Sequence, residues 1–175
     1  MKNSISNGVG EIIMLNNLDQ IFKTKEKDSS HKRVENYSIG HHLASDVLTP
    51  GKAENYLLCF ISFYCVDCIE LLPHLKEISE KFLGEIILFT NGSEEENIEI
   101  SKYFDFDFTI NTYTKEELAI TYRVSMTPFV YLLDSNFIVS SANNIKDEYE
   151  LNKLLSDQKL LRLLQTSVQQ EGVPE

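Results

Sequence analysis

The chain has 175 residues, of which 42% are hydrophobic, so it is long enough to form one domain with a sizeable core. Its formal charge of −11 creates a field that repels nucleic acid and anionic lipid, which excludes both as partners. No apolar run is long enough to be a transmembrane segment or a secretory signal. We therefore expect a cytoplasmic protein, or an extracytoplasmic one if a signal or anchor has been removed.

The first 36 residues are polar and form an N-terminal extension ahead of the expected domain. One segment within the extension has apolar residues at roughly helical spacing, which predicts a short amphipathic helix. These apolar residues are Ile12, Ile13, Leu18 and Phe22. We place the domain at residues 37–170 and a tail at 171–175.

Downstream, apolar periodicity predicts alternating strands and helices. In chain order we expect a strand at 57–63, a helix at 66–82, a strand at 85–90, a helix at 93–104, a strand at 107–110, a helix at 114–124, strands at 127–134 and 136–142, and a helix at 146–165. Ser93 and Thr114 suit helix N-caps, and Asp134-Ser135 suits a hairpin turn. This order predicts an α/β fold with a right-handed crossover between the first parallel strands.

Two cysteines, Cys65 and Cys68, lie where the first buried strand meets its helix. A C-x-x-C pair beside a β-α-β pattern indicates redox chemistry, because a helix N-terminus stabilises the thiolate that acts as nucleophile. The spacing also lets the two sulfur atoms approach bonding distance. We expect Cys65 to be accessible at the helix start and Cys68 to be more shielded.

With its flanking residues the pair resembles the thioredoxin superfamily, most closely the bacterial TlpA-like and MauD-like thiol-disulfide oxidoreductases. Tyr64 precedes the cysteines, Pro73 follows the second cysteine by five residues, and Thr127-Pro128 precedes a later strand. The resemblance implies a thioredoxin fold, with a central mixed β-sheet flanked by helices. It also implies that Thr127-Pro128 is a cis-proline loop facing the cysteines, which offers backbone groups to a substrate chain, while Tyr64 shapes the surface beside the nucleophile.

Three positions depart from that family pattern. Tyr64 stands where many members have Trp, Cys59 stands where thioredoxins keep a buried carboxylate, and Leu71 stands where some TlpA-like reductases have Glu. The usual proton acceptor for Cys68 is therefore missing, which leaves water, Asp67 or another group in that role. Cys59 lies within a buried run and suits a small apolar core residue.

The residues between the cysteines, Val66 and Asp67, bear on the redox potential. The charge of Asp67 opposes a thiolate at Cys65, and the motif contains no cationic residue to offset it. We therefore expect the pKa of Cys65 not to be strongly lowered. A less stable thiolate implies a more reducing couple, which favours a reductase.

Three other interpretations remain open. A zinc site would need two more ligands, and His41, His42 and His74 show no matching spacing. A peroxiredoxin would use Ser62 three residues before Cys65, but Leu58 stands where its proline is expected. A redox-degenerate module that only binds a peptide or protein beside Pro128 is the alternative from a different class.

The pattern as a whole predicts a thiol-disulfide oxidoreductase acting on a protein or peptide. Cys65 attacks the substrate disulfide and Cys68 resolves the mixed disulfide. No cofactor or metal is needed beyond the cysteine pair, and an upstream electron donor or acceptor is implied. We expect a monomer or a weak dimer.

Overall fold

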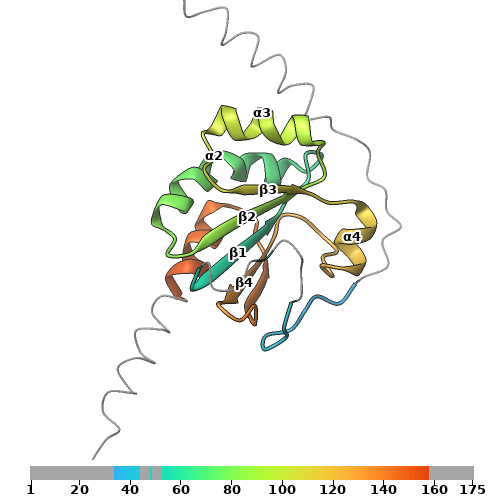
Figure 1. Cartoon of the computed structure of the whole chain (residues 1–175), viewed down its shortest axis with the longest axis vertical. Coiled ribbons are helices and arrows are strands. Elements are labelled where there is room, and N and C mark those ends of the chain that lie inside the picture. Colours follow the sequence, from blue (N-terminus) through green and yellow to red (C-terminus); the bar gives the residue numbers. More distant parts are fainter. Residues whose placement is uncertain (1–33, 44–47, 49–52, 158–175) are drawn as a thin grey trace, which may run out of the picture.

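The computed structural model describes residues 34–43, 48 and 53–157. They form a mixed five-stranded sheet with the strand order β3-β2-β1-β4-β5 (Figure 1). In chain order its elements are β1 (Asn55–Phe60), α2 (Val66–Lys81), β2 (Glu85–Thr90), α3 (Glu94–Phe104), β3 (Thr109–Thr112), α4 (Lys115–Ile120), β4 (Phe129–Asp134) and β5 (Val139–Asn144). A further helix covers 148–157. β1, β2 and β3 are parallel, whereas β4 is antiparallel to both β1 and β5.

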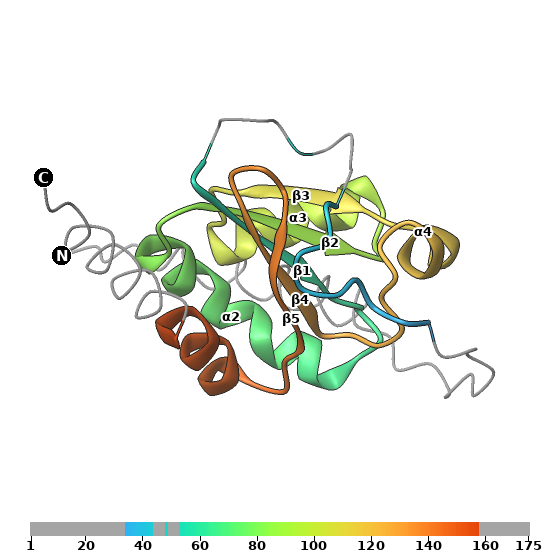
Figure 2. The same ribbon diagram turned by 90° about the horizontal axis from the view of Figure 1, so that it is seen from below.

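The central strand β1 is buried on both faces, as its continuous apolar sequence predicts. Because successive side chains of a strand point to opposite faces, Leu57 and Cys59 join one hydrophobic cluster while Leu58 and Phe60 join another. α2, α3 and the helix at 148–157 contribute to the first cluster. Figure 2 shows that last helix lying beside α2.

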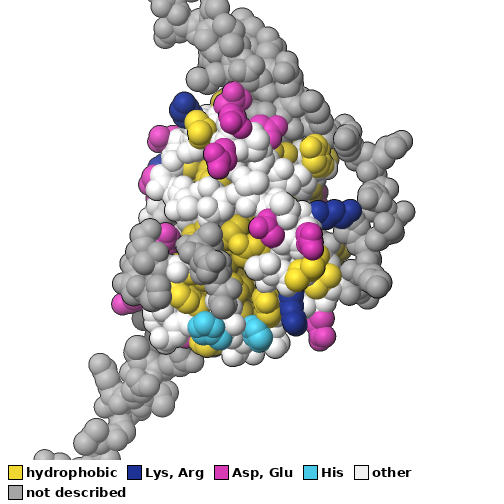
Figure 3. Space-filling model, turned by 45° about the vertical axis from the view of Figure 1, so that its right-hand side comes forward, with side chains coloured by type: hydrophobic (Ala, Val, Ile, Leu, Met, Phe, Trp, Pro, Cys, Tyr) yellow, Lys and Arg dark blue, Asp and Glu magenta, His cyan; other side chains and the backbone are white. Residues whose placement is uncertain are grey.

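The other face of the sheet carries an aromatic cluster, to which α4 contributes Leu118. Segment 34–43 also covers this face and is tied to the β4–β5 hairpin. The backbone N–H of Gly40 donates to the Val139 carbonyl at 2.8 Å, and that of Leu43 donates to the Phe137 carbonyl at 2.9 Å. Figure 3 shows this side of the molecule, where hydrophobic side chains emerge between scattered acidic ones.

The predicted order of strands and helices from residue 55 to 157 is confirmed, and so are both N-caps. Ser93 and Thr114 each form a capping box, with Glu96 and Glu117 respectively. The predicted amphipathic helix near the N-terminus, the tail and the end of the helix expected at 146–165 lie outside the described residues.

Several boundaries were predicted wrongly. β3 lies two residues later than expected, β4 begins two residues later, and α4 ends at Ile120 although the helix was expected to continue to 124. β1 and β5 differ as well. β1 begins at Asn55 and ends at Phe60, although the apolar run continues to Phe63, because Ile61 and Phe63 are buried in the loop that follows. β5 begins three residues later than expected because residues 135–138 connect it to β4. The Asp134 carboxylate accepts hydrogen bonds from the backbone N–H groups of Asn136 and Ile138 within that turn.

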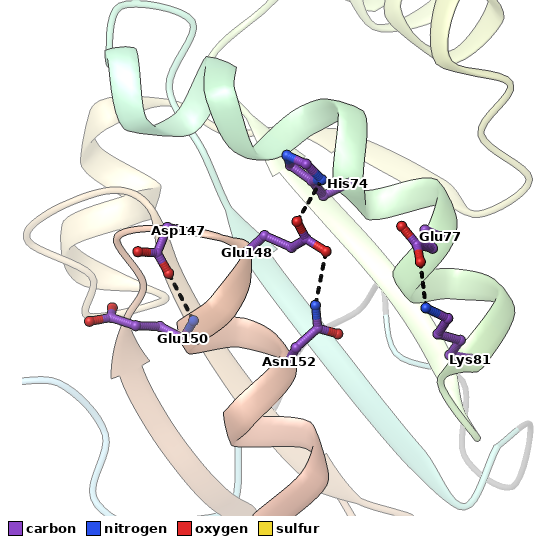
Figure 4. A network of polar contacts seen from close by, with 7 residues as sticks. All are labelled: His74, Glu77, Lys81, Asp147, Glu148, Glu150 and Asn152. Atoms are coloured by element: carbon purple, nitrogen blue, oxygen red, sulfur yellow. Dashed lines mark hydrogen bonds and ion pairs between the residues drawn. The ribbon is translucent and has the colours of Figure 1, made fainter.

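The last described helix is fastened to α2 by side chains from both (Figure 4). His74 of α2 lies 2.9 Å from the carboxylate of Glu148, whose other oxygen accepts from Asn152 at 3.1 Å. The Asp147 carboxylate accepts from the backbone N–H of Glu150 at 2.8 Å, in the manner of an N-cap. These contacts hold the start of the helix beside the middle of α2.

Candidate functional site

The two cysteines lie at the start of α2, at the carboxyl end of β1. Cys65 is the N-cap residue of the helix and is half-buried, whereas Cys68 has no exposed surface. Both are free thiols. The Cys65 side chain is therefore partly accessible while that of Cys68 is fully buried, as the sequence predicted.

The pKa of Cys65 is lowered to about 6, chiefly by a hydrogen bond from the Cys68 side chain. Burial and, to a smaller extent, the charge of Asp67 raise this pKa. The backbone N–H of Cys68 and the Thr127 side chain lower it further. At pH 7 a thiol with this pKa is about 90% thiolate. The expectation of a pKa that is not strongly lowered was therefore wrong.

The error has a clear physical origin. Asp67 acts in the predicted direction, but its charge is a smaller influence than the two donors supplied by Cys68. Those donors depend on the folded geometry of the first helical turn and leave no sign in composition. A more stable thiolate makes a couple more oxidising. The low pKa of Cys65 therefore does not support the expected reducing pair.

Burial strongly raises the pKa of Cys68, and its hydrogen bond to Cys65 raises it further. Two contacts act in the opposite direction, and the larger is the backbone N–H of Ser62, which donates to the Cys68 sulfur at 3.3 Å. The Thr127 side chain also lowers this pKa. Cys68 is thus a protonated thiol that donates to a thiolate at Cys65.

The loop before β4 brings Thr127 and Pro128 to the cysteines from the far end of the sequence. The peptide bond between these two residues is cis. As a thiol, Cys65 donates to the Thr127 carbonyl oxygen at 3.4 Å. The loop places a backbone acceptor and a hydroxyl group beside the sulfur atoms.

The loop between β1 and α2 is held by the loop that follows β2. The backbone N–H of Phe63 donates to the Asn91 side-chain oxygen at 2.8 Å, and the buried Phe63 ring lies against Gly92. A Cβ atom built on Gly92 would lie 2.2 Å from that ring. Gly92 is therefore required where the two loops meet.

Sequence reasoning missed Tyr113, which immediately follows β3. Its buried hydroxyl donates to the Ile61 carbonyl oxygen at 2.7 Å. Burial raises its pKa, and the charges of Cys68 and Cys65 raise it further. The predicted strand order could have pointed to Tyr113. β1 and β3 are parallel, so residues that follow their carboxyl ends meet at the same edge of the sheet.

The surface around Cys65 is apolar on one side and acidic on the other. Tyr64, Val66 and Met126 have exposed fractions of 48%, 56% and 61%. Met126 was not singled out from the sequence, although it directly precedes Thr127. A groove between α2 and the last helix begins at Asp67 and is lined mainly by acidic side chains, with two basic ones among them. Its charged residues are Asp67, Glu70, His74, Lys146, Asp147 and Glu148.

The two positions where the family that the sequence resembles carries an acid are both buried and apolar. Cys59 lies in the core of β1, and burial raises its pKa to about 12. Leu71 is buried in the same cluster, whereas the neighbouring Glu70 is exposed. Neither position supplies an acceptor for the proton of Cys68.

Within residues 34–43, 48 and 53–157, no three His, Cys, Asp or Glu side chains are grouped as metal ligands. Across the same ranges no helix combines the length and apolar character needed to cross a bilayer.

No protein-family model matches the sequence, and a search of curated proteins finds no match. Solved structures do match. A Chlorobium tepidum protein provisionally named thiol:disulfide interchange protein DsbE superposes with a TM-score of 0.58 at 15% identity, over 71% of this chain and 96% of that one. A Cytophaga hutchinsonii domain provisionally named a thiol-disulfide isomerase gives 0.51 at 20% identity, over 73% and 98%.

An uncharacterized conserved protein from Geobacillus kaustophilus gives a TM-score of 0.53 at 14% identity, over 66% of this chain and 73% of that one. At these identities the likeness concerns the fold. The sheet order, the cysteines at the start of α2 and the opposing cis-proline agree with it. The chain has a thioredoxin fold.

Proposed function

We propose that the chain is a thiol-disulfide oxidoreductase acting on a protein or peptide substrate. The observation that carries this proposal is the hydrogen bond from a buried, protonated Cys68 to a half-exposed Cys65 whose pKa is about 6. This arrangement supplies an accessible nucleophile that is largely ionised at neutral pH and a second thiol beside it.

The proposed reaction has two exchange steps. The Cys65 thiolate attacks one sulfur of a substrate disulfide, forms a mixed disulfide and releases the other substrate sulfur as a thiolate. Cys68 then loses its proton to solvent and attacks the Cys65 sulfur, which releases the second substrate thiolate and leaves a Cys65–Cys68 disulfide. Two electrons pass from the pair to the substrate, and an external thiol donor restores the pair. The reverse sequence oxidises a dithiol.

The residues around Cys65 suit the binding of an extended chain. The Thr127-Pro128 backbone offers hydrogen-bonding groups beside the sulfur, and β-type pairing there would align a substrate segment. Tyr64 and Val66 add exposed apolar surface on the other side of the nucleophile. No cofactor beyond the cysteine pair takes part in this reaction.

Insulin reduction with dithiothreitol as electron donor tests the proposal. We expect the wild-type chain to accelerate precipitation of the reduced insulin chains and Cys65→Ser to abolish the acceleration. Cys68→Ser should accumulate mixed disulfide and turn over poorly. An inactive wild-type protein that still binds peptides would favour the binding module instead. Titration of the pair against glutathione then gives the direction of catalysis from its reduction potential.

A further inference from the structure

We propose that Tyr113 is a positioning residue that strengthens, through the peptide bond between Ile61 and Ser62, the hydrogen bond that stabilises the Cys68 thiolate during resolution. The inference rests on the proposed function, because it concerns the second exchange step. It assigns a role to a residue that lies forty-five positions from Cys68 in the sequence.

The connection runs through a single amide group. The Tyr113 hydroxyl donates to the Ile61 carbonyl oxygen at 2.7 Å, and the N–H of the same peptide bond, on Ser62, donates to the Cys68 sulfur at 3.3 Å. A donor at the carbonyl oxygen draws electron density from the amide and makes its N–H more positive. Hydrogen bonds joined in this way reinforce one another, most of all where water is excluded.

Most of this chain of contacts is buried. Tyr113, Ile61 and Cys68 are buried, and Ser62 is half-buried. Tyr113 is itself held in place, since its backbone N–H donates to the Thr90 carbonyl at 2.7 Å. Burial and the nearby cysteine charges both raise its pKa, so the phenol stays protonated and remains a donor wherever Cys68 reacts.

The connection matters because, in the described part of the chain, the two positions where an acid was expected near Cys68 carry Cys59 and Leu71. Its strongly raised pKa is opposed mainly by the Ser62 N–H, with a smaller effect from the Thr127 side chain. Among the other titratable groups around the pair, Asp67 of α2 acts through its charge on Cys65, and Cys59 of β1 is buried with a pKa of about 12. The backbone N–H of Ser62 cannot accept the proton of Cys68, but it stabilises the thiolate once the proton has left.

Stopped-flow reaction of the reduced protein with DTNB separates the two steps. In the first phase Cys65 displaces one thionitrobenzoate and forms a mixed disulfide. In the second phase Cys68 attacks Cys65 and releases the other. We expect Tyr113→Phe to slow the second phase roughly 1.3- to 4.6-fold, the equivalent of losing about 10–30% of a hydrogen bond to a charged sulfur, and to shift its pH profile upward while leaving the first phase unchanged.

Tyr131→Phe is the matched control. The Tyr131 hydroxyl is also a buried donor to a backbone carbonyl, that of Tyr122 at 3.0 Å, but no cysteine is among the groups that act on its pKa. Both variants should lose thermal stability, whereas only Tyr113→Phe should change the second phase. If Tyr113→Phe does not fold, fluorotyrosine at position 113 supplies a stronger donor of similar size and should accelerate that phase.

The outcomes separate the two proposals. A wild-type protein that releases no second thionitrobenzoate contradicts the proposed function. Two phases in the wild type, with the same second-phase rate and pH profile in Tyr113→Phe as in Tyr131→Phe, overturn the role of Tyr113. An unchanged second phase with fluorotyrosine overturns it as well.

Discussion

The carbonyl oxygen of Thr127 lies 3.4 Å from the sulfur of Cys65, although sixty-two residues separate them in the sequence. The side chain of the same threonine lowers the pKa of both cysteines. The loop before β4 thus supplies both a backbone acceptor and a hydroxyl group at the point where exchange would occur.

The alkylation rate of Cys65 should depend on pH as for a thiol of pKa about 6. Because the thiolate is the reactive form, iodoacetamide labelling should rise as pH increases through 6 and level off above it. Cys68→Ala removes the contact that stabilises the Cys65 thiolate most, and it should raise the pH of this midpoint by about 1–2 pH units. Labelling by mass spectrometry across pH measures both, and a midpoint near the ordinary thiol value in the wild type would contradict the assigned contacts.

Removing the Thr127 hydroxyl should also raise the pKa of Cys65. Thr127→Val preserves shape but cannot donate, so we expect the midpoint of the same alkylation profile to rise by up to about one unit. Thr127→Ser retains the hydroxyl and serves as the control. Equal midpoints in the two variants would show that the hydroxyl does not act on the sulfur.

Cys59 should be inert in the folded protein. It has no exposed surface, and burial raises its pKa to about 12, so its thiolate is negligibly populated at neutral pH. We expect native protein treated with iodoacetamide to carry label on Cys65 and none on Cys59, with Cys59 labelled only after unfolding. Peptide mapping before and after denaturant addition checks this, and rapid native labelling of Cys59 would argue for a third redox thiol.

Gly92→Ala should destabilise the protein by about 1–3 kcal/mol, because a methyl group there overlaps the buried ring of Phe63. Denaturant unfolding measures the change. The double variant with Phe63→Leu should be less sensitive to the added methyl group, since the ring is the obstacle. Gly40→Ala is a useful comparison: it meets no atom within 4 Å and is disfavoured only by its φ of +85°.

The charge of a substrate peptide should affect the rate at which its disulfide is reduced. The chain carries a net charge of −11, and the groove beside Cys65 is lined by Asp67, Glu70, Asp147 and Glu148. A disulfide peptide rich in lysine should therefore be reduced faster than one with glutamate at the same positions, and salt should narrow the difference. Steady-state rates at low and high ionic strength test this, and a preference for the acidic peptide would exclude electrostatic steering by this surface.

Much of the fold could be predicted because its signals are local. Helical periodicity from Ile69 onward, capping residues at Ser93 and Thr114, and the turn at Asp134 each depend on neighbours in the sequence. The end of β1 could not be predicted, since burial continues through Ile61 and Phe63 after the backbone has left the sheet.

The site was harder to predict because its decisive contacts join distant segments. The positions of Cys65 and Cys68 at the start of the helix follow from the motif. The low pKa of Cys65 depends on where the Cys68 hydrogen and backbone N–H point, and only the folded chain fixes this. The role of Tyr113 was not predicted because its contact partner, Ile61, lies fifty-two residues away in the sequence. Cytoplasmic location, oligomeric state and the electron donor stay predictions.

Complete burial of Cys68 has a practical consequence for finding the physiological client. Only Cys65 presents a sulfur to an incoming chain, so every intermolecular linkage should form through one defined residue. In Cys68→Ala that linkage has no internal thiol to break it. The variant should therefore act as a covalent bait whose captured partner, released by a reducing agent, can be sequenced together with the cysteine it used. Capture will work best at a mildly alkaline pH, because the same substitution removes the contact that keeps Cys65 ionised.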